Sequence, residues 1–235
     1  QKKLSRSLIL MGKTLAPEAF TLPTPPFHRE VERELMDTSS KKLSIQYPRD
    51  HAKSTLAAEL LPIWHLFFQH VAEQRPRRTR FIVLISKTLR EAKARLRTIK
   101  AIIQNESAPV GQTPFSDLMG NWGEETARSW TDEKVVLKDG STIVASGWSQ
   151  QGRGLKIDHQ RPSLMVIDDP EDENNTKTQK AMEDNLQWLL SALEPATSRN
   201  GRILLIGTPI RQKSMVRVLH DAKDWTSVKY NALYD

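Results

Sequence analysis

The segment from Leu43 to Thr55 most limits the folds that this chain can adopt, because it has the pattern of a strand, a loop and the start of a helix. Leu43 to Tyr47 is short and β-prone, whereas residues 54–71 carry apolar side chains at helical spacing, with a kink predicted at Pro62. The strand therefore leads into a helix N-terminus, which offers unpaired N–H groups and a positive dipole end to an anion. An ordinary β-turn-α junction with a basic first turn would have the same pattern.

The loop in this segment has the end of a phosphate-binding loop but lacks its glycines. In the consensus G-x-x-x-x-G-K-[ST], backbone N–H groups surround the phosphates, the lysine reaches the β- and γ-phosphates, and the hydroxyl ligates Mg²⁺. Lys53 and Ser54 occupy the last two positions, while Tyr47 and Ala52 stand in place of the glycines. The motif is therefore degenerate, and its interpretation depends on residues elsewhere in the chain.

A second informative segment is the apolar run Leu164 to Ile167, which ends in the adjacent carboxylates Asp168 and Asp169. Such a run is typical of a buried parallel strand whose carboxyl end projects acids into a ligand crevice. We expect Asp168 to hold Mg²⁺, directly or through water, and Asp169 or Glu171 to orient or deprotonate the attacking water. Five acids within residues 168–173 repel one another unless cations compensate them, which favours a metal-phosphate site over a solvated acidic turn.

A third apolar run, Arg202 to Ile206, is followed by Gly207, Thr208 and Pro209. In a parallel sheet, the Thr208 hydroxyl would lie at the same edge as the acidic residues, where it would sense the γ-phosphate. Gly and Pro also end strands as ordinary turn residues. The three strand ends taken together favour a nucleotide site.

These residues resemble the ATPase domain of the large terminase subunit, the DNA-packaging motor of tailed bacteriophages. The resemblance covers most of the chain. It rests on Pro-Phe-His-Arg-Glu at 26–30, Pro-Arg-Asp-His-Ala-Lys-Ser-Thr at 48–55, Arg-Gly at 153–154, Ile-Asp-Asp-Pro-Glu-Asp at 167–172 and Ile-Gly-Thr-Pro at 206–209. Terminase loops commonly carry an arginine shortly before the lysine, which Arg49 matches.

The resemblance implies an α/β fold of the P-loop NTPase class, with ATP and Mg²⁺ as cofactors. The alternation of strands and helices predicts a mainly parallel central sheet flanked by helices, and Asp139-Gly140 predicts a hairpin that adds antiparallel strands. We expect residues 1–40 to form an N-terminal approach and adenine-side segment, in which Phe27 and His28 either contact the base or pack as a short helix. We expect residues 41–235 to form the ATPase core, and we expect this chain to lack the C-terminal nuclease domain of the family.

The resemblance also implies roles for individual residues. The residues expected to bind the nucleotide are Arg49, Asp50, His51, Ala52, Lys53, Ser54 and Thr55. Ser54 and Asp168 are expected to bind the metal. The catalytic candidates are Asp169, Glu171, Arg49, Arg153 and Thr208.

Two of these roles stay open. Many terminases have Asp-Glu where this chain has Asp168-Asp169, so the base is either Asp169 acting through an intervening water or Glu171. The arginine that stabilises transition-state charge is Arg153 supplied to a neighbouring subunit, with Arg161 as a second candidate, or Arg49 within the same chain.

The function that the resemblance implies is ATP hydrolysis coupled to translocation of double-stranded DNA into a procapsid, in the host cytoplasm. The partners that it implies are the DNA, the portal protein, the small terminase subunit and other copies of the chain in a ring. The alternatives are a helicase or translocase of another P-loop family and a non-hydrolysing nucleotide- or DNA-binding module.

Composition agrees with an anionic partner. The formal net charge is +7 and the isoelectric point is near 9.6, which makes nucleic acid the first candidate, although a generically basic protein would have the same charge. The chain has no cysteine, which excludes disulfides and thiolate metal sites. No apolar run approaches the length of a membrane span and no signal peptide is evident, so we expect no membrane partner.

Overall fold

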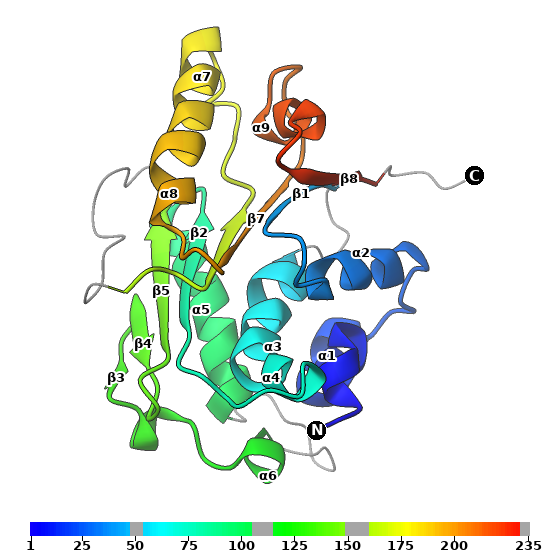
Figure 1. Cartoon of the computed structure of the whole chain (residues 1–235), viewed down its shortest axis with the longest axis vertical. Coiled ribbons are helices and arrows are strands. Elements are labelled where there is room, and N and C mark those ends of the chain that lie inside the picture. Colours follow the sequence, from blue (N-terminus) through cyan, green and yellow to red (C-terminus); the bar gives the residue numbers. More distant parts are fainter. Residues whose placement is uncertain (48–53, 105–114, 149–159, 231–235) are drawn as a thin grey trace.

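The computed structural model describes residues 1–47, 54–104, 115–148 and 160–230. These residues form an eight-stranded sheet in the order β3-β4-β5-β2-β6-β7-β1-β8 (Figure 1). The strands are β1 (Lys42–Gln46), β2 (Phe81–Ser86), β3 (Ser129–Trp130), β4 (Lys134–Val136), β5 (Thr142–Gly147), β6 (Leu164–Asp168), β7 (Arg202–Gly207) and β8 (Thr226–Lys229).

The direction of these strands confirms the predicted sheet. From β5 to β8 every neighbouring pair is parallel, whereas β3 and β4 pair antiparallel at the β5 edge. The predicted hairpin joins β4 to β5, and Gly140 in its turn has φ +86°, a conformation that glycine adopts without steric cost. The fold is therefore a mainly parallel α/β sheet with an antiparallel addition.

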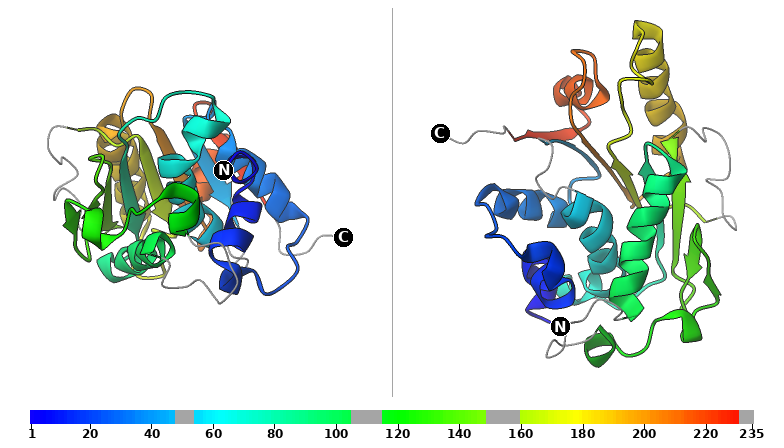
Figure 2. Two further views of the ribbon diagram at one scale, coloured as in Figure 1. Left: turned by 90° about the horizontal axis from the view of Figure 1, so that it is seen from below. Right: turned by 180° about the vertical axis from the view of Figure 1, so that it is seen from behind.

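Helices cover both faces of the sheet (Figure 2). The helices are α1 (Leu8–Leu15), α2 (Phe27–Met36), α3 (Leu61–Phe67), α4 (Gln69–Ala72), α5 (Leu89–Gln104), α6 (Phe115–Met119), α7 (Gln179–Trp188), α8 (Glu194–Ala196) and α9 (Met215–Val218). Two π-helical segments adjoin them, at Thr55–Leu60 and Leu189–Leu193. Of the helices that the structure describes, none is long and apolar enough to cross a membrane.

The two faces of the sheet belong to two separate apolar cores. In β2, Ile82 and Leu84 pack into the core shared with α1, α2, α3 and α5, whereas Val83 and Ile85 pack into the core shared with α9 and the second π-helical segment. Successive side chains of a strand point to opposite faces, so a strand covered on both sides must be apolar throughout. This is why β2 reads as a continuous apolar run.

The helix after the predicted phosphate loop differs from its prediction. One helix was expected over residues 54–71, with a kink at Pro62. The structure has the π-helical segment Thr55–Leu60, then α3, and a break at Phe68 before α4. Because Pro62 cannot donate to the carbonyl four residues earlier, the regular pattern cannot continue through it, and the wider turn lies directly before it.

The N-terminal segment contains one helix that the sequence patterns did not predict, α1. The side chain of Ser7 caps this helix by accepting from the N–H of Leu10, and Glu32 of α2 accepts from the N–H of Ile9 at 2.8 Å. The short helix expected at Phe27 and His28 is present as α2. Buried residues of both helices pack into the same core as β1.

Candidate nucleotide site

The candidate site lies where β1, β6 and β7 end at the carboxyl edge of the sheet. Gln46, the last residue of β1, is in register with Gly207 of β7, and Asp168 of β6 is in register with Ile206. β7 therefore lies between the strand before the predicted phosphate loop and the acidic strand. The expectation that the three strand ends meet at one edge is confirmed.

The central contact joins Ser54 to Asp168. The Ser54 hydroxyl donates to Asp168 Oδ1 at 3.0 Å, and the Asp168 side chain is only 4 % exposed. Ser54 precedes the π-helical segment and Asp168 ends β6, so the sheet brings together two residues that are 114 positions apart. A hydroxyl oxygen and a carboxylate oxygen thus lie next to each other.

These two oxygens fit a magnesium ion that is bound together with a nucleotide. Among the residues that the structure describes, no three His, Cys, Asp or Glu side chains lie close enough to hold a metal by themselves. Mg²⁺ is commonly held by one or two carboxylates together with substrate phosphates rather than by an all-protein cage. The donor set of Ser54 and Asp168 therefore suits a metal-nucleotide complex better than a free ion.

Arg95 of α5 adds a charged contact that the sequence analysis did not predict. Its Nε donates to Asp168 Oδ2 at 3.2 Å, and its Nη1 donates to Glu59 Oε1 at 3.0 Å. Burial acts to lower the pKa of Arg95, but the charges of Asp168 and Glu59 outweigh burial and raise it. Burial raises the pKa of Glu59, and the guanidinium of Arg95 opposes that shift.

A sequence signal for this arginine exists. Ala92, Leu96 and Ile99 are buried on α5, and Arg95 falls on the same stripe, three residues after Ala92. A charged residue on an apolar stripe needs a buried partner. In the structure the partners of Arg95 are Asp168 and Glu59.

Asp169 lies at the turn that follows β6. Its φ is +45°, a left-handed conformation that Asp tolerates better than most residues, and its N–H donates to the carbonyl of Ile206 at 2.8 Å. Its Oδ1 accepts from the N–H of Thr208 at 2.9 Å. The Thr208 hydroxyl in turn donates to the carbonyl of Tyr47 at 3.2 Å, so the predicted site residue Thr208 contacts both neighbouring strand ends.

Glu171, the second candidate for the base, is held by a different element. Its Oε2 accepts from the N–H of Met215, the first residue of α9, at 2.9 Å. Burial raises the pKa of Glu171 to about 7, against the opposing effects of the Met215 N–H and the Ser214 side chain. Its other oxygen, Oε1, is buried and has no hydrogen-bond partner among the described residues.

The structure does not reach several predicted site residues. Outside the described residues lie Arg49, Asp50, His51, Ala52, Lys53 and Arg153. Thr55 begins the π-helical segment after Ser54. Arg161 precedes β6 and donates to the carbonyl of Pro195, at the opposite end of that strand from Asp168.

The region expected beside the adenine is a packed aromatic cluster. The Phe27 ring lies 4.6 Å from the His28 ring and 5.7 Å from the Tyr47 ring, and Tyr47 lies 5.8 Å from Tyr230, measured between ring centroids. All four residues are buried. Phe27 and His28 therefore lie in a helix that packs against aromatic residues, and their contact with the base stays a prediction.

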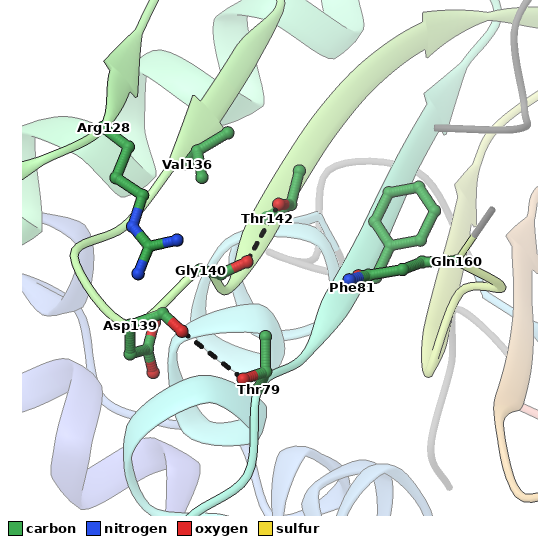
Figure 3. Close-up of a pocket in the computed structure, with 8 residues that line it drawn as sticks. All are labelled: Thr79, Phe81, Arg128, Val136, Asp139, Gly140, Thr142 and Gln160. Carbon is green, nitrogen blue, oxygen red and sulfur yellow. Dashed lines mark hydrogen bonds between the residues drawn. The ribbon is translucent and has the colours of Figure 1, made fainter. Parts of the chain in front are cut away.

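The described residues also line a cavity of about 330 Å³ away from this site (Figure 3). Phe81 and Thr142, which begin β2 and β5, lie in its wall together with Arg128, Asp139 and Gln160. The amino ends of these strands face away from the carboxyl edge. This cavity is therefore separate from the candidate nucleotide site.

Comparison with known proteins identifies the class of fold. No family model and no curated protein matches this chain. Solved structures do match, and they show the fold of P-loop NTPases, as predicted from the resemblance to terminases.

The first of these structures is the large terminase of bacteriophage HK97, with 14 % identity and a TM-score of 0.62 over 98 % of this chain and 44 % of that one. The large terminase ATPase domain of Thermus phage P74-26 has 13 % identity and a TM-score of 0.51, over 90 % of this chain and 82 % of that one. A DEAD box protein from the hyperthermophile Methanococcus jannaschii has 13 % identity and a TM-score of 0.50, over 92 % of this chain and 52 % of that one. This chain spans less than half of the HK97 protein, and at these identities the likeness is one of fold.

Proposed function

We propose that this chain binds Mg-ATP at the carboxyl edge of its sheet and hydrolyses it to move double-stranded DNA into a viral procapsid. The observation that carries the proposal is the 3.0 Å hydrogen bond between Ser54 and Asp168. It pairs a hydroxyl at the end of a degenerate phosphate loop with a carboxylate at the end of a buried strand. A P-loop NTPase needs these two oxygens next to each other to bind magnesium.

In this proposal each residue around the site has its own role. Arg49 through Thr55 would surround the phosphates, with Lys53 reaching the β- and γ-phosphates. Ser54 and Asp168 would hold Mg²⁺, which neutralises phosphate charge when bound. Asp169 would position the water.

Thr208 would relay the state of the site to the rest of the sheet. Its N–H is bonded to Asp169 and its hydroxyl to the carbonyl of Tyr47, so it contacts the acidic turn and the start of the loop at once. A displacement of Asp169 during hydrolysis would change both contacts.

The packaging part of the proposal rests on the likeness to terminase ATPase domains and on the charge of +7. Double-stranded DNA is the proposed substrate, because cationic proteins bind its phosphates by releasing counterions. Portal protein, the small terminase subunit and further copies in a ring are the proposed partners, and the procapsid in the host cytoplasm is the proposed location. In the ring, Arg153 would act on a neighbour's nucleotide.

A helicase or translocase of another P-loop family is the second candidate, because a DEAD box protein shares the fold at a TM-score of 0.50. A duplex-unwinding assay separates the two, since a packaging motor moves duplex DNA without separating its strands. A non-hydrolysing nucleotide-binding module would bind Mg-ATP without turnover.

The deciding experiment is Mg²⁺-dependent ATP binding and hydrolysis by the wild type, Lys53→Ala and Asp168→Ala, measured across protein concentration. We expect both variants to lose hydrolysis by about 100-fold or more. Lys223→Ala and Asp221→Ala, at exposed positions, are the matched controls and should keep wild-type rates. A rate per chain that rises with concentration would support an arginine supplied by a neighbour, and no nucleotide binding by the wild type would overturn the proposal.

A further inference from the structure

We propose that Arg95 is a positioning residue of the nucleotide site, which orients Asp168 so that one carboxylate oxygen stays with Ser54. This inference rests on the proposed function. It concerns a residue outside the phosphate loop, the acidic strand and the turn after β7.

The two oxygens of the Asp168 carboxylate accept hydrogen bonds from different residues. Oδ2 accepts from Arg95 Nε at 3.2 Å, while Oδ1 accepts from the Ser54 hydroxyl at 3.0 Å. Because each oxygen accepts from a different donor, rotation of the carboxylate would break at least one of these hydrogen bonds. The oxygen that faces Ser54 is thus kept there by the arginine on the opposite oxygen.

Arg95 itself is held by a second carboxylate, that of Glu59. Its Nη1 donates to Glu59 at 3.0 Å, and the Glu59 side chain is only 9 % exposed. A guanidinium presents its donors in a rigid planar fork, so one side chain can engage two carboxylates at a fixed angle. Glu59 lies in the π-helical segment that follows Ser54, so Arg95 ties the helix after the loop to the end of β6.

The charges of these three side chains also favour this role. Arg95 makes ion pairs with both Glu59 and Asp168, so its positive charge lies between two carboxylates. Without the arginine, these two carboxylates would repel each other in a site of low exposure. Arg95 engages Oδ2 of Asp168, whereas Oδ1 is the oxygen beside Ser54.

The test compares Arg95→Met, which removes the guanidinium but keeps a similar stem, with Arg95→Lys, which keeps the charge but loses the fork. Binding of a fluorescent ADP analogue is measured with and without Mg²⁺. We expect Arg95→Met to weaken Mg²⁺-dependent binding by about 10-fold to 100-fold, as for other residues that orient a metal ligand, and to leave Mg²⁺-free binding unchanged. Arg95→Lys should recover part of the loss, and Arg97→Met, at an exposed position of the same helix, should match the wild type.

A purely structural role would lower Mg²⁺-dependent and Mg²⁺-free binding together, and that result would overturn the inference. If Arg95→Met does not fold, Glu59→Gln provides the same comparison, because it removes one of the charges that hold the guanidinium.

A second readout does not depend on nucleotide. In a crystal structure of unliganded Arg95→Met, or of Glu59→Gln in its place, the Asp168 carboxylate should have turned away from Ser54, whereas an unchanged hydrogen bond would contradict the proposal. A wild type that binds no nucleotide would overturn the proposed ATPase function, and this crystal structure would still decide the role of Arg95.

Discussion

The carboxylate of Asp169 accepts a hydrogen bond from the N–H of Thr208 at 2.9 Å, which joins the residue after β6 to the residue after β7. The Thr208 hydroxyl donates to the carbonyl of Tyr47 at 3.2 Å, at the start of the loop that follows β1. Asp169 is therefore two hydrogen bonds away from the predicted phosphate loop. This short path gives a specific way to test which acid acts in hydrolysis and how its state is passed on.

Asp169→Asn should greatly slow hydrolysis without weakening the binding of Mg-ATP. The amide oxygen can still accept from the N–H of Thr208, while the negative charge is removed. We expect turnover to fall by about 100-fold or more while Mg-ATP binding stays near that of the wild type. Turnover and nucleotide titrations check this. Glu171→Gln is the matched variant, and a loss of turnover there, with Asp169→Asn active, would assign the base to Glu171.

Thr208→Val should separate turnover from its coupling to DNA. Valine has a similar shape but cannot donate to the carbonyl of Tyr47, and loss of one such hydrogen bond costs about 1 kcal/mol of stability. We expect basal ATP turnover to persist and stimulation by double-stranded DNA to disappear. Thr208→Ser keeps the hydroxyl and should behave as the wild type. Equal stimulation in both variants would exclude a relay through this hydroxyl.

The stability of the protein should fall as pH rises from about 4.5 to about 7 because of Glu171. Its folded pKa of about 7 lies above the ordinary value of 4.5, so in this window the folded state binds more protons than the unfolded state. The contribution is fully present below pH 4.5 and lost above pH 7, and at about 1.4 kcal/mol per pKa unit it amounts to roughly 3 kcal/mol.

Glu171→Gln isolates this contribution, because glutamine keeps the acceptor for the N–H of Met215 but does not titrate. Urea unfolding of the wild type and the variant at pH 5 and pH 8 measures it. We expect the variant to gain stability relative to the wild type at pH 8. The same difference in free energy of unfolding between the two proteins at both pH values would contradict the prediction.

Gly147→Ala should destabilise the fold at the end of β5. A Cβ at this position would lie 2.6 Å from the backbone N of Leu89, where α5 begins, and 3.2 Å from the carbonyl carbon of Thr88. Backbone atoms cannot move aside as a flexible side chain can, so we expect a loss of roughly 1–3 kcal/mol, measured by chemical denaturation. Since α5 carries Arg95, Mg²⁺-dependent nucleotide binding should weaken as well. An unchanged stability would show that α5 shifts at no cost.

The parts of the site that the sequence predicted are those that follow from runs of adjacent residues. Asp168 ends an apolar strand, and Thr208 follows another, so both were expected at one edge of a parallel sheet, and the register of β6 with β7 confirms it. The contact of Arg95 with Asp168 was not predicted, because the two residues are 73 positions apart and their contact depends on how α5 packs against β2 and β5. The place of Arg95 on the apolar stripe indicates that it needs a partner, but only the tertiary structure shows that the partner is Asp168.

The sequence by itself determined the local elements. Continuous apolar runs defined β2, β6 and β7, helical spacing defined α2 and α5, and Asp139-Gly140 defined the turn between β4 and β5. These patterns arise from the periods of strand and helix and from the backbone freedom of glycine, all of which act over a few residues.

Tertiary structure alone decided the order of the strands and the contacts that depend on it. β7, although late in the chain, lies between β1 and β6, and this arrangement places Ser54 within 3.0 Å of Asp168 across 114 positions. It also turned Arg95 toward buried carboxylates and Glu171 toward α9. The physical reason is that burial of both faces of the sheet depends on how all of its helices pack together, which no short stretch of sequence encodes.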